Sequence, residues 1–101
     1  MPTNLVAPYA RAAVHAQGNG TALRWKNVTN VTRTGPGRYT VTLASHIDTT
    51  TAICQVTPDR GANWNTEVYY SVDTTNNNHK VEVLTGTNGA ATDNPFHLVV
   101  L

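Results

Sequence analysis

The chain is constrained most by short runs of residues in which apolar and polar side chains alternate. In the clearest run, residues 38–44, Tyr39, Val41 and Leu43 alternate with Arg38 and threonines. A period of two is that of a β-strand with one buried face. Short strands between closely spaced turns are typical of a β-sandwich or a small barrel. Clusters rich in glycine, proline and asparagine separate the runs, at residues 18–20, 35–37, 58–61, 75–78 and 86–89.

The same alternation predicts several further strands. We expect residues 28–34 and 38–44 to form a hairpin across Gly35-Pro36-Gly37, because glycine supplies the backbone freedom that a tight reversal needs. A second hairpin is expected across the polar residues 76–78. Pro58 cannot donate to a ladder, so it should end the strand before it. The remaining predicted strands are residues 51–57, 66–72, 79–84 and 96–101.

The segment from Pro8 to Gln17 is ambiguous between helix and strand. Its alanines, its leading proline and the following Gly18 satisfy several helix signals. It also alternates with a period of two, and an isolated helix of this length is marginal in water. We therefore interpret it as a strand whose hairpin partner is Thr21 to Trp25.

Composition agrees with the pattern. The 101 residues include 17 threonines and 12 valines, which suit a pleated surface, but few of the residues that favour exposed helices. The prediction is an all-β fold, an antiparallel β-sandwich of jelly-roll-like type with about seven to eight short strands. We expect an N-terminal arm over residues 1–9 and a single domain over residues 10–101.

Charge and cysteine content exclude several functional classes. A net charge of +1 with two lysines cannot neutralise a run of phosphates, so we expect no nucleic-acid binding. No apolar run is long enough for a membrane span, and no signal peptide is visible. The single cysteine, Cys54, excludes an internal disulfide and a cysteine-based zinc site. Because Cys54 falls in an apolar strand pattern, we expect it to be inert packing.

No local motif indicates catalysis, a cofactor or a metal. His15, His46, His79 and His97 show no paired ligand spacing, so we expect ordinary surface or half-buried histidines. Most aspartates lie in or beside predicted turns, where such side chains usually bond their own backbone. The serines lack the context of a nucleophile elbow. We therefore expect a protein that is not an enzyme and holds no cofactor or metal.

Aromatic residues suggest a binding surface. A sugar-binding face would use large aromatics by stacking, and one or two of them would instead fill the core; the candidates are Trp25, Trp64, Tyr69 and Tyr70. Trp64 lies in the irregular stretch from Asp59 to Asn65, which we expect to make the contact. The candidate residues for receptor or carbohydrate contact are Arg60, Asn63, Trp64 and Asn65.

Three segments together resemble a known family. Residues 27–43, NVTNVTRTGPGRYTVTL, place a Val-x-x-Val-Thr-Arg strand, a G-x-G turn and a Tyr-Thr-Val-Thr strand in order. The following residues, Ile47 to Thr57, resemble that family's next strand. Residues 92–101, TDNPFHLVVL, are similar to that family's closing strand. This order resembles small β-sandwich domains at the ends of tailed-bacteriophage tail fibres and appendages.

The resemblance implies a structural protein on the virion surface, made in the cytoplasm of the host bacterium. It implies a homotrimer in contact with other virion proteins of the capsid or tail, with receptor contact made by loops. The protein could be a fibre tip or a capsid decoration protein, and the resemblance does not decide between them. The alternative function is a module that binds a carbohydrate or host-surface glycan. A core without disulfides or metal would gain from apolar burial between subunits. The candidate interface residues are Leu5, Val6 and Tyr9 of the arm and Val99 and Leu101 of the last strand.

Overall fold

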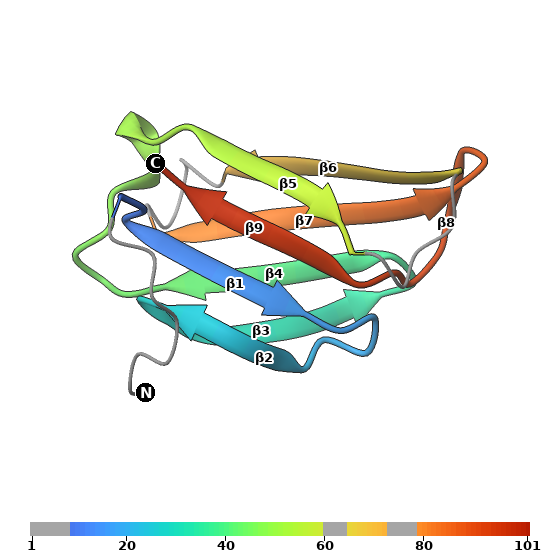
Figure 1. The fold of residues 1–101 in the computed structure, drawn as a ribbon, viewed down its shortest axis with the longest axis horizontal. Coiled ribbons are helices and arrows are strands. Elements are labelled where there is room, and N and C mark those ends of the chain that lie inside the picture. The colour runs from blue at the N-terminus through green and yellow to red at the C-terminus, as the bar shows by residue number, and fades with distance from the viewer. Residues whose placement is uncertain (1–8, 60–64, 73–78) are drawn as a thin grey trace.

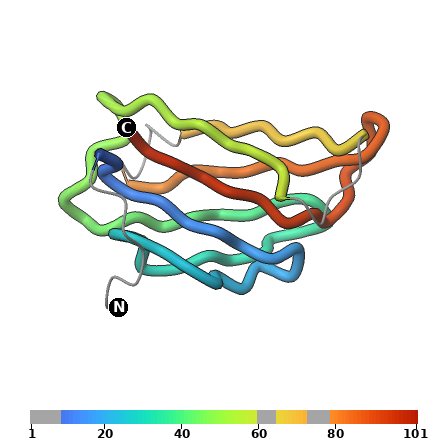
Figure 2. Tube along the Cα trace, viewed as in Figure 1, coloured from blue at the N-terminus to red at the C-terminus, as the bar shows by residue number. Residues whose placement is uncertain are grey.

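The computed structural model describes residues 9–59, 65–72 and 79–101. These residues form two antiparallel sheets that pack face to face (Figure 1 and Figure 2), which confirms the predicted all-β sandwich. The first sheet has the strand order β2 (Ala22–Lys26), β1 (Ala12–Ala16), β9 (Phe96–Val100) and β5 (Cys54–Pro58). The second sheet has the order β3 (Val28–Gly35), β4 (Arg38–Leu43), β7 (Lys80–Thr87) and β6 (Thr66–Val72), with β8 (Ala90–Ala91) also beside β7.

The core lies between the sheets and consists of one face of each strand. The rings of Tyr39 from β4 and Phe96 from β9 meet across it, with centroids 5.1 Å apart. The alternation predicted the inward faces of β4, β7 and β9 correctly, because a pleated strand presents every second side chain to one side. The most buried apolar side chains on these three strands are Tyr39, Val41, Leu43, Val81, Val83, Phe96, Leu98 and Val100.

The predicted hairpins are confirmed as well. Strand β3 pairs with β4, and β6 pairs with β7. The ambiguous segment is strand over Ala12–Ala16 and pairs with β2. Hairpin pairing and burial of alternate side chains stabilise this segment as a strand, although its alanines also favour a helix.

Two strand boundaries and the regularity of one strand differ from the prediction. Strand β5 begins at Cys54, because Asp48 caps a short 3₁₀ turn, η1 (Thr49–Thr51), by accepting from the Thr50 N–H at 2.9 Å. Strand β3 contains a register shift between Val28 and Asn30, so its alternation is broken by a bulge. Strand β7 continues to Thr87, through part of the turn expected at residues 86–89.

The reversal after β7 has a local cause. Asn88 and Gly89 both have positive φ, 53° and 80°. Two central residues with positive φ define the hairpin turn for which Asn-Gly is the preferred sequence. The tight turn brings β8 back beside the end of β7.

Cys54 and Trp25 contribute to packing. Cys54 is buried in the core, as predicted, and burial raises the pKa of its thiol. Trp25 is half-buried and packs against the core from β2. Within the described part of the chain, no helix has the length and apolar character needed to cross a membrane.

Candidate functional site

Two of the four histidines meet on the outer face of the first sheet. His15 of β1 and His97 of β9 are directly paired in the antiparallel register, and their ring centroids are 4.2 Å apart. Asp59 follows the end of β5, where its N–H donates to the carbonyl of Pro95 at 3.1 Å. Three adjacent strands therefore place two imidazoles and a carboxylate together. We call these three residues the His15 cluster.

The hydrogen bonds of His15 define its tautomer. A guanidinium can only donate, so Nδ1 of His15 accepts from Nη2 of Arg24 at 3.0 Å. Nε2 then carries the proton and donates to Oδ2 of Asp59 at 2.6 Å. The side chains of His15 and Asp59 are 12% and 25% exposed, so this contact is shielded from most of the solvent.

His97 lies beside this pair in a half-buried position. Burial lowers the pKa of His97, and its neighbours His15 and Arg24 lower it further, because a second protonated imidazole or the guanidinium would repel the charged ring. Asp59 acts in the opposite direction. The neutral imidazole is therefore favoured near neutral pH, with a nitrogen lone pair available to a ligand.

A shallow hollow of about 300 Å³ adjoins the two histidines and Arg24. Its remaining lining comes from apolar residues of β1 and β9. The imidazoles are thus accessible from one side, while the sheet supports them from the other.

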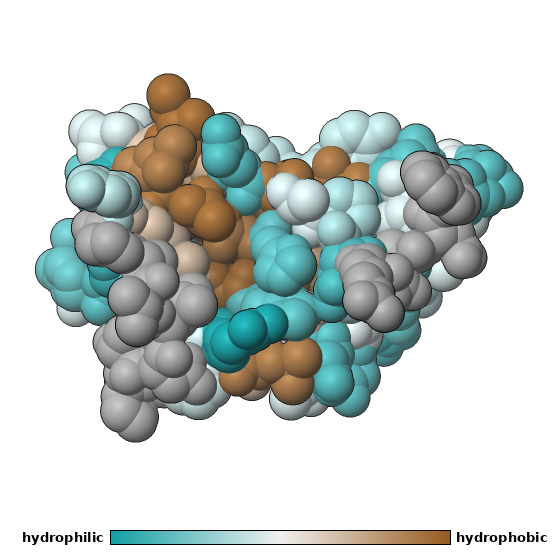
Figure 3. Space-filling model, in the orientation of Figure 1, coloured by the Kyte–Doolittle hydropathy of each residue, from teal (hydrophilic) through white to brown (hydrophobic). Residues whose placement is uncertain are grey.

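Apolar side chains gather on the same face near the end of the chain (Figure 3). Ile53 is 67% exposed and Leu101 is 46% exposed, and the N–H of Leu101 donates to the carbonyl of Ile53 at 2.9 Å. Val99 points outward from β9 between Ala13 and Gln55, its partners in the register. We call Ile53, Val99 and Leu101 the apolar strip.

The candidate interface residues are therefore brought together only in part. Val99 and Leu101 both belong to the apolar strip, whose most exposed member, Ile53, was not among the predicted interface residues. Tyr9 is 94% exposed. Leu5 and Val6 lie outside the described residues.

Most of the candidate glycan-contact residues, Arg60, Asn63 and Trp64, also lie outside the described residues. Asn65 is exposed, and its carbonyl accepts from the N–H of Asn88 at 3.3 Å.

Close to Asn65, the outer face of the second sheet has a hollow of about 320 Å³. Tyr69, Leu84 and Arg38 form a cross-strand row in its lining. Tyr69 is 58% exposed, and its hydroxyl donates to Oε2 of Glu67 at 3.2 Å. An exposed aromatic ring next to charged groups therefore lies at the end of the sandwich where Asn65 is found.

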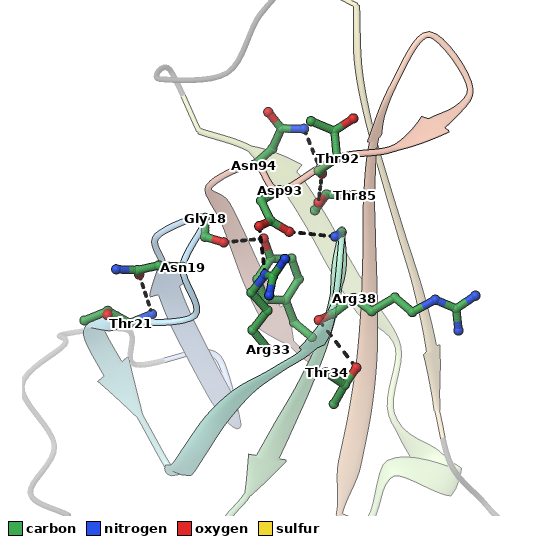
Figure 4. Close-up of polar contacts among 12 residues, drawn as sticks. Gly18, Asn19, Thr21, Arg33, Thr34, Arg38, Thr85, Thr92, Asp93 and Asn94 are labelled. Atoms are coloured by element: carbon green, nitrogen blue, oxygen red, sulfur yellow. Dashed lines mark hydrogen bonds and ion pairs between the residues drawn. The ribbon is translucent and has the colours of Figure 1, made fainter.

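Hydrogen bonds of Asp93 and Tyr39 join three parts of the chain at one end of the sandwich: Gly18, the β3–β4 hairpin and Asp93 itself (Figure 4). The Asp93 carboxylate accepts from the N–H of Gly37 and from Nε of Arg33, each at 2.7 Å. Beside it, the buried Tyr39 hydroxyl donates to the carbonyl of Gly18 at 2.6 Å. The Gly37 hydrogen bond, with a further contribution from Arg33, lowers the pKa of Asp93, while burial followed by the Asp93 charge raises that of Tyr39. We call these five residues the Asp93 cluster.

The expectation that aspartates bond their own turns is correct for Asp48 and wrong for Asp93. Asp48 accepts from Thr50, two residues away, whereas Asp93 accepts from residues 56 and 60 positions away. The pairing of His15 with His97 was also missed, because it depends on the order of the strands in the sheet. The one available signal was that both histidines occupy polar positions of alternating runs.

Comparisons with protein-family models, with curated proteins and with solved structures found no match to this chain.

Proposed function

We propose that the protein is a non-enzymatic structural component of the outer surface of a tailed-phage virion. The sequence resemblance of residues 27–43 and 92–101 supports this role. In the fold these segments supply the β3–β4 hairpin and the strand β9, and the Asp93 cluster joins them. These two segments therefore supply one inner strand of each sheet, β4 and β9, and the edge strand β3.

We also propose that copies of the chain associate through the apolar strip. Ile53 directly precedes β5 and Leu101 directly follows β9, and both expose large aliphatic side chains. The hydrogen bond between their backbones places them side by side. Only 13% of the residues are charged and the net charge is +1, so two copies repel each other weakly. Burying this strip against the same face of other copies would add to a core that has no disulfide. A homotrimer is the assembly that we propose.

Localisation tests the function directly. Phage particles from the source bacterium would be purified on a density gradient, analysed by quantitative mass spectrometry and labelled with an antibody for electron microscopy. We expect the protein to co-purify at a fixed number of copies per particle. Label on the tail tip indicates a fibre or appendage, and regular label on the head indicates decoration. Recovery only in the soluble cell fraction would contradict the proposal.

The hollow beside Tyr69 favours a second candidate function, contact with a host-surface glycan. Sugars stack on exposed aromatic rings, and Glu67 and Arg38 are polar groups suited to hydroxyls. The Tyr69→Ala variant should lose binding on a glycan array, while Tyr9→Ala, which removes another exposed tyrosine, should not. Equal binding by both variants would exclude the hollow as a glycan site.

A further inference from the structure

We infer that His15, Asp59 and His97 form a binding site for a divalent transition-metal ion, for which Zn²⁺ is the natural probe. This inference rests on side-chain geometry and is independent of the proposed virion role. The three residues come from, or directly follow, three adjacent strands of one sheet, so their backbones are held by the ladder.

The distances suit a metal of this size. One ligand atom from each of the three side chains lies within 4.8 Å of the other two. In a tetrahedral site with ligand bonds of about 2.0–2.2 Å, ligand atoms are separated by about 3.3–3.6 Å. Small rotations of the side chains would bring all three atoms to this separation. The ion would then replace the proton that His15 now shares with Asp59.

The donor set selects the kind of metal. Two imidazole nitrogens and one carboxylate oxygen suit Zn²⁺ and its transition-metal neighbours, whereas Mg²⁺ and Ca²⁺ prefer oxygen ligands. The adjoining hollow leaves a side of the site open for a fourth ligand.

Arg24 opposes the metal, and this gives the proposal a specific signature. When Nε2 of His15 binds the ion, the imidazole proton moves to Nδ1, so no net proton is released from this residue. Nδ1–H then faces the Arg24 guanidinium, which can only donate. The hydrogen bond must break and the exposed guanidinium must move away, and its positive charge also repels the ion. Removing this side chain should therefore strengthen metal binding.

The experiment is a Zn²⁺ titration of tag-free protein by calorimetry, in competition with a chelator of known affinity. We expect one ion per chain and a rise in melting temperature on the order of 10 °C at saturation, with no response to Mg²⁺ or Ca²⁺. The His97→Gln variant should weaken Zn²⁺ binding by more than about tenfold. The Arg24→Gln variant should bind Zn²⁺ several-fold more tightly than the native protein.

His46→Gln is the matched control, because His46 is an exposed histidine that is not part of the cluster. It should bind Zn²⁺ as the native protein does. Circular dichroism of each variant without metal establishes that it is folded, and Co²⁺ absorption reports the ligand geometry in those that are. Equal affinities for the native protein and His97→Gln, or weaker binding by Arg24→Gln, would overturn the proposal. Absence of binding by the native protein would overturn it too.

Discussion

Gly37 gives the sharpest test of how the sandwich is closed at the Asp93 cluster. Its φ is +67°, and a Cβ added there would lie 2.3 Å from the carbonyl oxygen of Thr85 and 2.9 Å from the nitrogen of Thr92. Gly89 has a similar φ of +80°, but a Cβ there would meet no atom within 4 Å. The Gly37→Ala and Gly89→Ala variants therefore share the backbone cost and differ only in the steric clash.

The magnitudes follow from this difference. Placing alanine in the left-handed region costs about 1–2 kcal/mol at either position. At Gly37 the new methyl group must also displace backbone that forms hydrogen bonds, because Gly37 N–H donates to Asp93 and Thr85 N–H donates to the Gly37 carbonyl, each at 2.7 Å. Losing two such bonds adds roughly 1–3 kcal/mol. We therefore expect Gly37→Ala to cost about 2–5 kcal/mol and Gly89→Ala about 1–2 kcal/mol.

Thermal and urea unfolding of both variants, followed by circular dichroism, measures these costs. For a domain of this size each kcal/mol lowers the melting temperature by about 4–8 °C. Gly37→Ala should therefore melt roughly 5–20 °C below Gly89→Ala. If the two variants melt within about 2 °C of each other, the close packing of Gly37 against Thr85 and Thr92 does not limit the residue at this position.

Three further outcomes follow from the buried and charged groups. The folded-state pKa of Asp93 lies below the unfolded value, so its contribution is present above about pH 4 and is lost as the pH falls through the folded pKa. Because this side chain is 36% exposed, its contribution to the free energy of unfolding should be under about 1 kcal/mol. Urea unfolding between about pH 2 and 5 should show this loss of stability in the native protein and not in Asp93→Asn, and the same pH dependence in both would contradict the role of the carboxylate. Tyr39→Phe, which leaves the Gly18 carbonyl without its donor, should cost about 1 kcal/mol in urea unfolding, and a neutral effect would contradict the hydrogen bond's role. The Cys54 thiol should react with a thiol reagent at neutral pH only after denaturation, so fast native labelling would show that it is accessible.

The sequence predicted most of the strands because burial repeats every second residue within one strand. Alternation assigned the inward faces of β4, β7 and β9, and turn chemistry located the β3–β4 hairpin. The displaced start of β5 and the bulge in β3 depend on local hydrogen bonding and pairing, which alternation does not report.

The candidate sites were less predictable, because they depend on contacts between strands that are distant in the sequence. His15 and His97 are 82 positions apart in a chain of 101 residues, and they meet only because β1 pairs with β9. Asp93 likewise reaches Arg33 across 60 positions. Neither contact is marked by a local sequence motif. Both depend on how distant segments pair and pack in the fold, which local alternation does not determine.

Sedimentation equilibrium of the tag-free protein at micromolar concentration is the most direct test of the proposal that copies associate through the apolar strip. It should be run with and without a chelator, so that association is measured separately from metal binding. We expect a mass three times the 10.9 kDa of one chain, and a single-chain mass for Ile53→Lys. Leu84→Lys, which places the same charge on the opposite outer face, should remain trimeric. A native protein that sediments as a monomer of 10.9 kDa would contradict the proposed association.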